Sequence, residues 1–205
     1  MDMRISKGEI FERVFINEEV NLQIDQEAGS HVKIHVINAS FSITVNQLGE
    51  GCLTEIYGLE NLHGDESVTA ETHVTHAVGG GSSNQLIKFV LDDNARGRFI
   101  GDLKIAPDAQ HTEAHQTNRN LLLSDNAEMR TQPQLEIYAD DVQATHGAST
   151  GQLDETALFY MQQRGIDKQK ARQLLVNAFM KEIIETISDD RLREQLLNAI
   201  DGVVE

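Results

Sequence analysis

The sequence predicts a mainly β protein, in which a parallel β-helix is followed by a small C-terminal α-helical domain. Short segments of alternating apolar and polar residues recur between turn residues at a spacing of roughly 8 to 12 residues. That spacing also fits a β-sandwich, but the β-patterned region contains no Asn-Gly or Asp-Gly hairpin turn, and the chain has only two prolines. A β-helix needs no hairpins, because its successive strands pair in parallel. We therefore expect a β-helix core over residues 1–151 and a helical domain over residues 152–205.

The predicted strands follow one another through the first three quarters of the chain. The clearest alternating segments are 20–24, 32–36, 41–45, 68–74, 86–91, 100–105 and 135–137. The breaks between them fall at residues 29–30, 49–51, 64–65, 79–81, 92–94 and 107–108, which are rich in Gly, Asp and Pro. Asp140-Asp141 interrupts the last segment, and alternation resumes at Val142, Ala144 and His146. This parity places the imidazole of His146 on the same face as small apolar side chains.

Helical spacing of apolar residues begins near residue 153. Asp154 is placed to cap a first helix, and Gly165 is placed to end it in the left-handed conformation. Asp167 starts a second helix, whose apolar residues form one stripe over about five turns up to Ile187. After an interruption at residues 188–190, the pattern predicts a third helix over residues 191–204. These helices either cap the β region or present a face to another protein.

Composition limits the classes of function. The formal net charge is −16, which argues against nucleic acid or an anionic membrane as a partner. Cys52 is the single cysteine, so no intrachain disulfide can form, and this chain alone cannot hold an iron–sulfur cluster or a structural zinc. No run approaches the roughly 18 apolar residues of a membrane span, and the N-terminus has no signal-peptide pattern. We expect a soluble cytoplasmic protein.

Histidines are the main chemical candidates, and His146 is the best of them. It is interpreted either as a histidine satisfied near the core or as a neutral ligand whose second nitrogen is oriented by a neighbour. His73 and His76 should point to opposite faces of a strand, which disfavours a shared metal. His111, Glu113 and His115 share a parity, but the polar segment 109–120 favours a solvated edge.

The remaining histidines and the acidic pair have simpler interpretations. His31, His35 and His63 are interpreted as surface or turn residues, and Asp140-Asp141 as a turn rather than an acid–base pair.

Four motifs carry a family resemblance. They are QTNRNLLLS from residue 116, PQLEIYADDV from residue 133, HGAS from residue 146 and LFYMQQRGI from residue 158. In this order they resemble the SufB/SufD family of iron–sulfur cluster assembly proteins, over residues 97 to about 187. Residues 5–96 are similar to the family only in their β-helix pattern. The HGAS motif is closer to SufD, since SufB-like chains tend to read HEAT there.

The resemblance implies a right-handed parallel β-helix followed by a helical domain. It further implies a complex with a SufB-like subunit, which meets the end of the β-helix, and with a SufC-like ATPase, which docks on the C-terminal helices. A histidine of the HGA motif at the SufB junction carries over to His146 alone. Many SufD-like chains have Cys two positions earlier, where this chain has Ala144. The family's N-terminal helical region is expected to be missing, because the sequence starts in β pattern.

The functional hypothesis is therefore a non-enzymatic, SufD-like scaffold that contributes His146 to a cluster site shared with its partner. We expect no cofactor bound stably by this chain alone, and a transient iron–sulfur cluster in the complex. A second copy of the chain could replace the SufB-like partner. The alternatives are a β-helix carbohydrate-active enzyme and a purely structural homo-oligomer.

Overall fold

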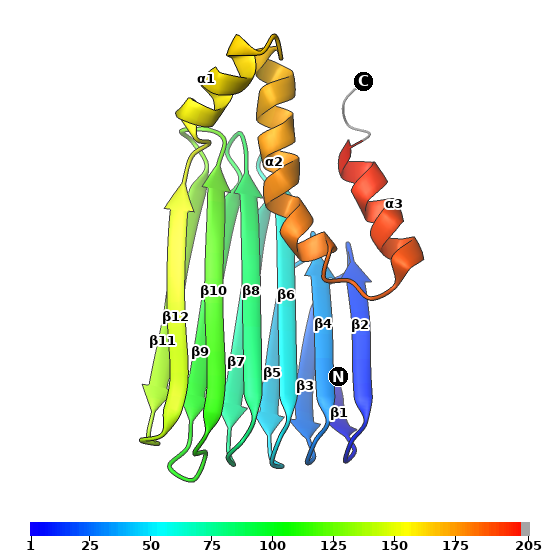
Figure 1. Cartoon of the computed structure of the whole chain (residues 1–205), viewed down its shortest axis with the longest axis vertical. Coiled ribbons are helices and arrows are strands. Elements are labelled where there is room, and N and C mark those ends of the chain that lie inside the picture. The colour runs from blue at the N-terminus through cyan, green and yellow to red at the C-terminus, as the bar shows by residue number, and fades with distance from the viewer. Residues whose placement is uncertain (202–205) are drawn as a thin grey trace.

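A computed structural model describes residues 1–201, which form two parallel β-sheets followed by three α-helices (Figure 1). Sheet A contains, in spatial order, β1 (Asp2–Ile5), β3 (Val20–Gln26), β5 (Phe41–Gln47), β7 (Ser67–His76), β9 (Arg96–Ile105) and β11 (Glu128–Ile137). Sheet B contains, in spatial order, β2 (Ile10–Ile16), β4 (His31–Ile37), β6 (Leu53–Leu62), β8 (Ser82–Leu91), β10 (Thr112–Leu122) and β12 (Val142–Gly151).

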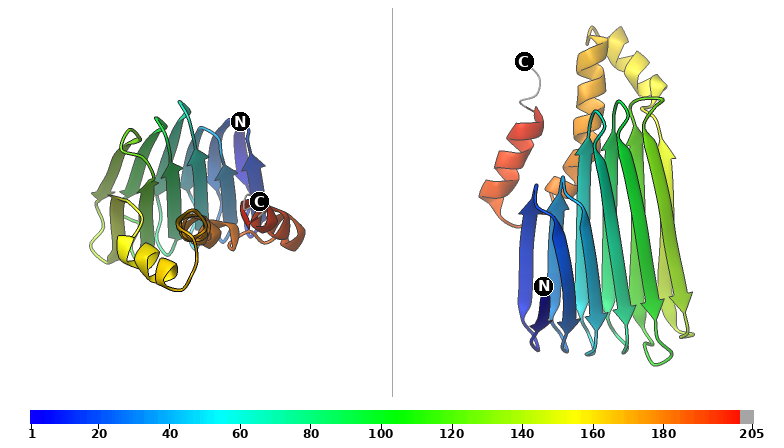
Figure 2. Two further views of the ribbon diagram at one scale, coloured as in Figure 1. Left: turned by 90° about the horizontal axis from the view of Figure 1, so that it is seen from above. Right: turned by 180° about the vertical axis from the view of Figure 1, so that it is seen from behind.

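The chain alternates between the two sheets, so each coil adds one strand to each of them. Every strand pairs in parallel with the strand two places away in the chain, as β8 does with β6 and β10. The view from above, along the strands, shows two layers facing each other, with all three helices outside sheet B (Figure 2, left). The predicted parallel β-helix with C-terminal helices is confirmed.

The main core fills the narrow space between the sheets. Its side chains are mostly Val, Ile, Leu and Ala, as the low aromatic content indicated. Ile24, Ile34, Ile43 and Ile56 are fully buried in it. Burying such a side chain contributes about 1.5–3 kcal/mol, and the alternation of buried and exposed residues along β3 and β5 repeats this gain on neighbouring coils.

Tight turns join the two sheets at the predicted breaks. Gly29 (φ 68°) and Gly51 (φ 67°) adopt the left-handed conformation that suits glycine. Asn38 (φ 54°) and Asp93 (φ 54°) do the same at the opposite end of the coils, as short polar side chains tolerate. The turn at Asn38 was not among the predicted breaks. The breaks between sequence segments are therefore crossings between sheets rather than hairpins.

Parts of the strand prediction were incomplete or wrong. The prediction named no segment for β1, β2 or β6. The segment 109–120 was interpreted as a solvated edge, but it forms most of β10, which lies between β8 and β12. Its inward residues Thr112, Gln116 and Asn118 are buried although they are polar. The hydropathy pattern led to the wrong interpretation, because the inward face of β10 carries hydroxyl and amide groups in place of aliphatic ones.

The helices are α1 (Glu155–Gln163), α2 (Lys168–Ile184) and α3 (Asp190–Asp201). Asp154 and Asp167 cap α1 and α2 as expected, each accepting backbone N–H bonds. Gly165 has φ 84°, which confirms the predicted stop. The third helix begins one residue earlier than predicted, and positions 202–204 of that prediction lie outside the described residues.

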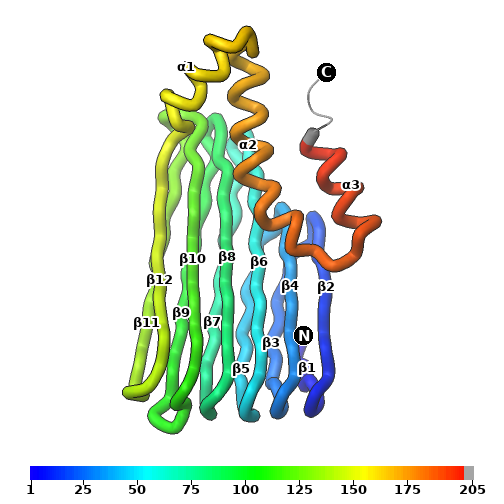
Figure 3. The backbone as a smooth tube through the Cα atoms, viewed as in Figure 1, coloured from blue at the N-terminus to red at the C-terminus, as the bar shows by residue number. Residues whose placement is uncertain are grey.

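A second apolar cluster joins α2 and the loop after it to the outer face of sheet B. Met180, Ile183 and Ile187 pack with Tyr57 and Val90. The backbone trace shows α2 running across β6 and β8 (Figure 3). The division into domains 1–151 and 152–205 stays a prediction. No helix in residues 1–201 is long and apolar enough to cross a membrane.

Candidate functional site

The open end of the β-helix is the place where the structure positions His146. β11 and β12 are the last strands of their sheets, and each pairs with a neighbour on one side only. Their other edges therefore present unpaired backbone N–H and C=O groups, which can extend a sheet into another chain. Most of β12 is exposed, although Val142 and Ala144 still pack against the main core.

His146 is the last member of a column of side chains that point into the β-helix. The register aligns Ile34, Ile56, Gln85, Gln116 and His146 on successive strands of sheet B. Gln116 is buried, whereas His146 is exposed because no coil follows to cover it. The predicted inward parity of His146 therefore leads to the open mouth of the β-helix rather than to a sealed core.

The described residues contain no group of three or more His, Cys, Asp or Glu side chains that could hold a metal ion. His146 supplies one nitrogen donor at the mouth. Cys52 is buried three strands away in sheet B, at the start of β6, with the carbonyl oxygens of Gly49 and Glu27 at 3.1 and 3.2 Å from Sγ. Iron or a cluster at His146 would need further donors from another chain.

The candidate pair His73 and His76 does not form a shared site. His73 lies outside sheet A with Nδ1 2.7 Å from Asp102 Oδ2, while His76 lies inside with Nε2 2.8 Å from Ser83 Oγ. Burial lowers the pKa of His76 to about 4. The predicted opposite faces of His73 and His76 are confirmed, which separates their rings.

The acidic and histidine groups near β10 lie outside sheet B. His111 precedes β10 and is exposed, with Nδ1 2.9 Å from Asp141 Oδ2 in the turn before β12. His115 and Glu113 point outward from sheet B, and His115 Nδ1 lies 2.8 Å from Thr145 Oγ1. Asp140-Asp141 forms the predicted turn.

His35 corrects the prediction that it is an ordinary surface residue. It is fully buried on the outer face of sheet B, stacked on Tyr57 with ring centroids 4.8 Å apart. Its Nε2 donates to Thr186 Oγ1 at 2.8 Å, because that hydroxyl donates its own hydrogen to the Ile183 carbonyl. Desolvation lowers the pKa of His35 to about 4. No local pattern could predict this burial, because the loop that covers His35 includes Thr186, which lies 151 positions further along the chain.

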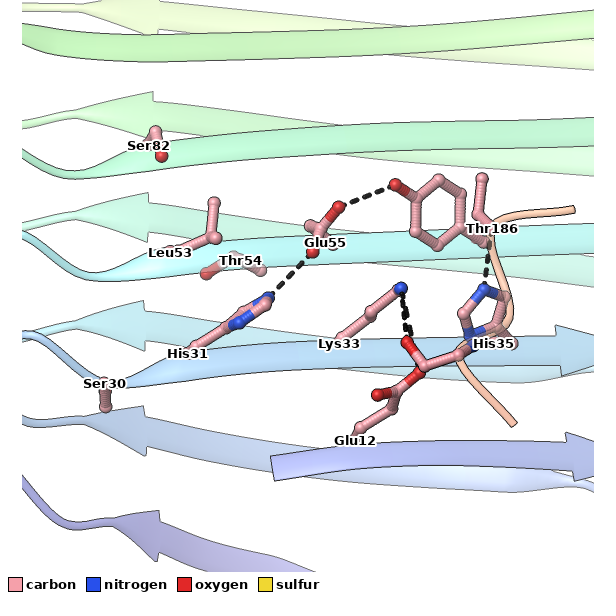
Figure 4. A network of polar contacts seen from close by, with 12 residues as sticks. Glu12, Ser30, His31, Lys33, His35, Leu53, Thr54, Glu55, Ser82 and Thr186 are labelled. Atoms are coloured by element: carbon pink, nitrogen blue, oxygen red, sulfur yellow. Dashed lines mark hydrogen bonds and ion pairs between the residues drawn. The ribbon is translucent and has the colours of Figure 1, made fainter. Parts of the chain in front are cut away.

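A polar network around His35 holds the loop between α2 and α3 on sheet B (Figure 4). Lys33 Nζ donates to Ser188 Oγ at 3.0 Å and lies 3.7 Å from Glu12 Oε1. Nearby, His31 Nε2 lies 2.7 Å from Glu55 Oε2. These contacts explain how a polar strip of the sheet can lie beneath the C-terminal loop.

Lys88 forms the second link between sheet and helix, and the sequence reasoning missed it. Its side chain is 1% exposed beneath α2, and Nζ donates to the Phe179 carbonyl at 2.6 Å and to Glu182 Oε2 at 2.5 Å. Burial lowers the pKa of Lys88, and the ammonium group lowers the pKa of Glu182. Arg119 on β10 also contacts Glu182, at 3.2 Å. The only feature of the sequence that could have indicated this link is the presence of a lysine within an apolar strand segment.

A pair of exposed aromatic side chains lies on α1. Leu158 anchors this helix and is 5% exposed, whereas Phe159 and Tyr160 are 61% and 57% exposed. Arg164 lies over the Tyr160 ring at 4.6 Å from its centroid. Large exposed rings on a short helix are typical of a contact surface for another protein.

Comparison with known proteins gives a consistent result. The model of the family described as "SUF system FeS cluster assembly, SufBD core domain" matches residues 18–179. The iron-sulfur cluster assembly protein SufD of Escherichia coli (strain K12) is 36% identical over 189 residues, which cover 91% of this chain and 44% of that protein. An iron-sulfur cluster assembly SufBD family protein of Synechocystis is 35% identical over 179 residues, covering 86% of this chain and 38% of that protein.

A plant relative is similar to the same extent. The chloroplastic protein ABCI7 of Arabidopsis thaliana is 32% identical over 187 residues, covering 88% of this chain and 39% of its own length. The chain thus spans less than half the length of these curated relatives.

Proposed function

Since this chain belongs to the SufBD core-domain family of the SUF system for iron–sulfur cluster assembly, and is SufD-like within it, we propose that it is a scaffold subunit of a cluster assembly complex. The observation that carries the proposal is His146, the inward-pointing donor at the exposed mouth of the β-helix. In this proposal the chain performs no catalysis. It supplies half of a site for a transient iron–sulfur cluster, which is the cargo of the complex.

The partner at the mouth is proposed to be a SufB-like subunit. The free edges of β11 and β12 support this, because strands of a second chain can pair with both edges at once. A partner docked there would bring its own donors next to His146, and thiolates are the usual ligands of iron–sulfur clusters. The lack of a metal-binding group within the described residues of this chain fits a shared site.

A second copy of this chain is the other candidate for that position, as in a structural homo-oligomer. The order of charges along β11 favours it. If two copies met in antiparallel fashion centred on Pro133, Arg130 of each copy would face Glu136 of the other. Such self-complementarity is what a two-fold interface requires, and opposite charges across strands are favourable.

The carbohydrate-active enzyme has less support. Of the exposed aromatic residues in the described chain, Phe159 and Tyr160 lie on α1, and Tyr138 follows β11. They do not form a row along one sheet face, as stacked sugar platforms would require.

The C-terminal helices are proposed to dock a SufC-like ATPase. Exposed Phe159 and Tyr160 on α1 support this role, and α2 is fixed to sheet B through Lys88 and Ile183. A movement of α1 would therefore be transmitted to α2 and from there to β8 and β10. We further propose a cytoplasmic location in a bacterial host, although the plant relative is named as chloroplastic.

The test of the junction is the variant His146→Ala in the complex reconstituted with a SufB-like subunit and a SufC-like ATPase. We expect the complex to assemble normally and cluster formation, measured anaerobically by iron and sulfide content, to be lost. His63→Ala is the matched control, since His63 is an exposed turn residue. Normal cluster formation by His146→Ala would remove this residue from the proposal. Assembly from this chain alone, seen by analytical ultracentrifugation, would favour the homo-oligomer.

The docking surface needs point variants rather than removal of residues 152–205, because deletion would uncover Tyr57 and Val90 on sheet B. The double variant Phe159→Ala/Tyr160→Ala should weaken binding to the ATPase by at least about tenfold, since aromatic anchors dominate interface energies. Leu48→Ala serves as the control, because Leu48 is an exposed apolar residue in the turn after β5, outside the helices. Unchanged affinity in the aromatic double variant would refute docking through α1.

A further inference from the structure

We propose that Gln116 is a positioning residue for His146, accepting the ring N–H of the imidazole through its side-chain oxygen. This inference rests on the proposed function, because it concerns the same histidine at the same junction. Gln116 lies on β10, and His146 is its register partner on β12 with the side chain on the same inward face. The two side chains are therefore nearest neighbours in one column across adjacent strands.

The amide group of Gln116 is held in place from two sides. On the side of β8, Nε2 donates to Gln85 Oε1 at 3.3 Å. On the side of sheet A, it packs against Gly101 of β9, where a Cβ atom built on Gly101 would lie 2.5 Å from Nε2 and 2.7 Å from Cδ of Gln116, and 2.6 Å from Cζ of the buried Phe99 ring. Any side chain at position 101 would push the amide away, so the glycine makes room for an extended Gln116.

The oxygen of this amide lacks a hydrogen-bond partner among the residues that the structure describes. Gln116 is 1% exposed, and its Oε1 makes no hydrogen bond within the described residues. A buried polar atom without a partner costs about 1–3 kcal/mol, so such an atom calls for an explanation. The register places His146 next to Gln116 in the column, on the side away from Gln85.

The imidazole of His146 is likewise without a partner in residues 1–201. It makes no hydrogen bond or ion pair with the part of the chain that the structure describes, and it is exposed at the mouth. A partner subunit that covers the mouth would remove water from the ring. Donation of one ring N–H to Gln116 Oε1 would then satisfy both groups, and the other ring nitrogen would keep its lone pair for iron. A hydrogen-bonded neighbour of this kind fixes the tautomer and orientation of a ligating histidine.

The experiment uses the complex with the SufB-like subunit and the SufC-like ATPase, in which only this chain carries ¹⁵N-labelled histidine. Ring nitrogen shifts report the tautomer, and the His146→Ala variant assigns the signal. We expect one fixed tautomer in the complex and a mixture in Gln116→Met, which keeps the length of the side chain but removes the acceptor. Anaerobic titration with ferrous ion should show affinity about 10 to 100-fold weaker in Gln116→Met.

A rescue variant and a matched control make the result decisive, and a third variant covers a failure to fold. Gln116→Glu keeps an acceptor oxygen and should restore both the single tautomer and the iron affinity, which a purely structural role of Gln116 would not predict. Gln143→Met, on the outward face of the same strand as His146, is the matched control and should behave as the wild type. If Gln116→Met does not fold, Gln116→Leu removes the same acceptor with a shorter side chain and should produce the same mixture of tautomers.

The two proposals fail in different ways. If Gln116→Met keeps the wild-type tautomer and an iron affinity within twofold, the positioning role is refuted, while loss of iron in His146→Ala still supports the shared site. If His146→Ala keeps its iron, the proposed function fails, whatever the tautomer in the Gln116 variants.

Discussion

Glu60 offers the sharpest test of how the β-helix interior treats a charge. This carboxyl group points into the core from β6, is fully buried, and receives one hydrogen bond, from the Ala39 backbone N–H at 2.8 Å. Its Oε1 has no partner among the described residues. Burial raises the pKa of Glu60 from 4.5 to about 9, so the folded protein holds a proton there at neutral pH.

The raised pKa makes stability depend on pH with a definite sign. Between pH 4.5 and 9 the folded state binds one proton more at Glu60 than the unfolded state, so stability falls as the pH rises. Each pH unit corresponds to about 1.4 kcal/mol, and the loss from pH 5 to pH 8 is therefore about 4 kcal/mol. Glu60→Gln removes this titration while keeping an acceptor for Ala39.

The assay is urea unfolding of the wild type and Glu60→Gln at pH 5, 6.5 and 8. The difference in the free energy of unfolding between the two proteins should shift by about 4 kcal/mol over this range in favour of the variant. A constant offset from the new amide group does not affect this comparison. Glu50→Gln, an exposed turn residue, should run parallel to the wild type. Parallel curves for wild type and Glu60→Gln would refute the buried neutral carboxyl.

Two more predictions concern buried titratable side chains. Burial lowers the pKa of His76 from 6.5 to about 4, so the stability contributed by the neutral imidazole is complete above pH 6.5 and is lost as the pH falls towards 4. In the same unfolding assay, His76→Gln should abolish about 3 kcal/mol of this acid destabilisation. At the contact between α2 and sheet B, Glu182→Ala leaves the buried Lys88 ammonium with only the Phe179 carbonyl and ring, and should lower the free energy of unfolding by about 3 kcal/mol. Lys88→Met should lower it by less, because Glu182 is half exposed and keeps its contact with Arg119. Urea midpoints of the single and double variants measure the difference, and equal losses in both single variants would contradict it.

Much of the fold could be predicted because the β-helix repeats a local rule. Alternation along Phe41–Gln47 and the glycines at 29 and 51 are properties of short segments, and they mark strand faces and turns wherever the segments lie. The caps at Asp154 and Asp167 are equally local. His146 could be placed on the inward face of the last strand by the same parity argument.

Contacts between distant residues could not be predicted in this way. Lys88 and Glu182 are 94 positions apart, and His35 is buried by a loop that the chain reaches only after all twelve strands. The strand β10 was misread because its buried face is lined by Gln116 and Asn118, whose burial depends on amide partners in the neighbouring coil. A hydropathy pattern contains no information about such partners.

Alternation within the strands, several of the turns, the start of the helices and the parity of His146 could be read from the amino-acid sequence, because backbone geometry and side-chain alternation act over a few residues. The sheet that the helices cover, the charged groups buried beneath them, and the position of His146 at an open end next to Gln116 emerge only from the folded arrangement. Those features arise from parallel stacking, which brings residues about 30 positions apart into direct register and lets the final coil end without a cover.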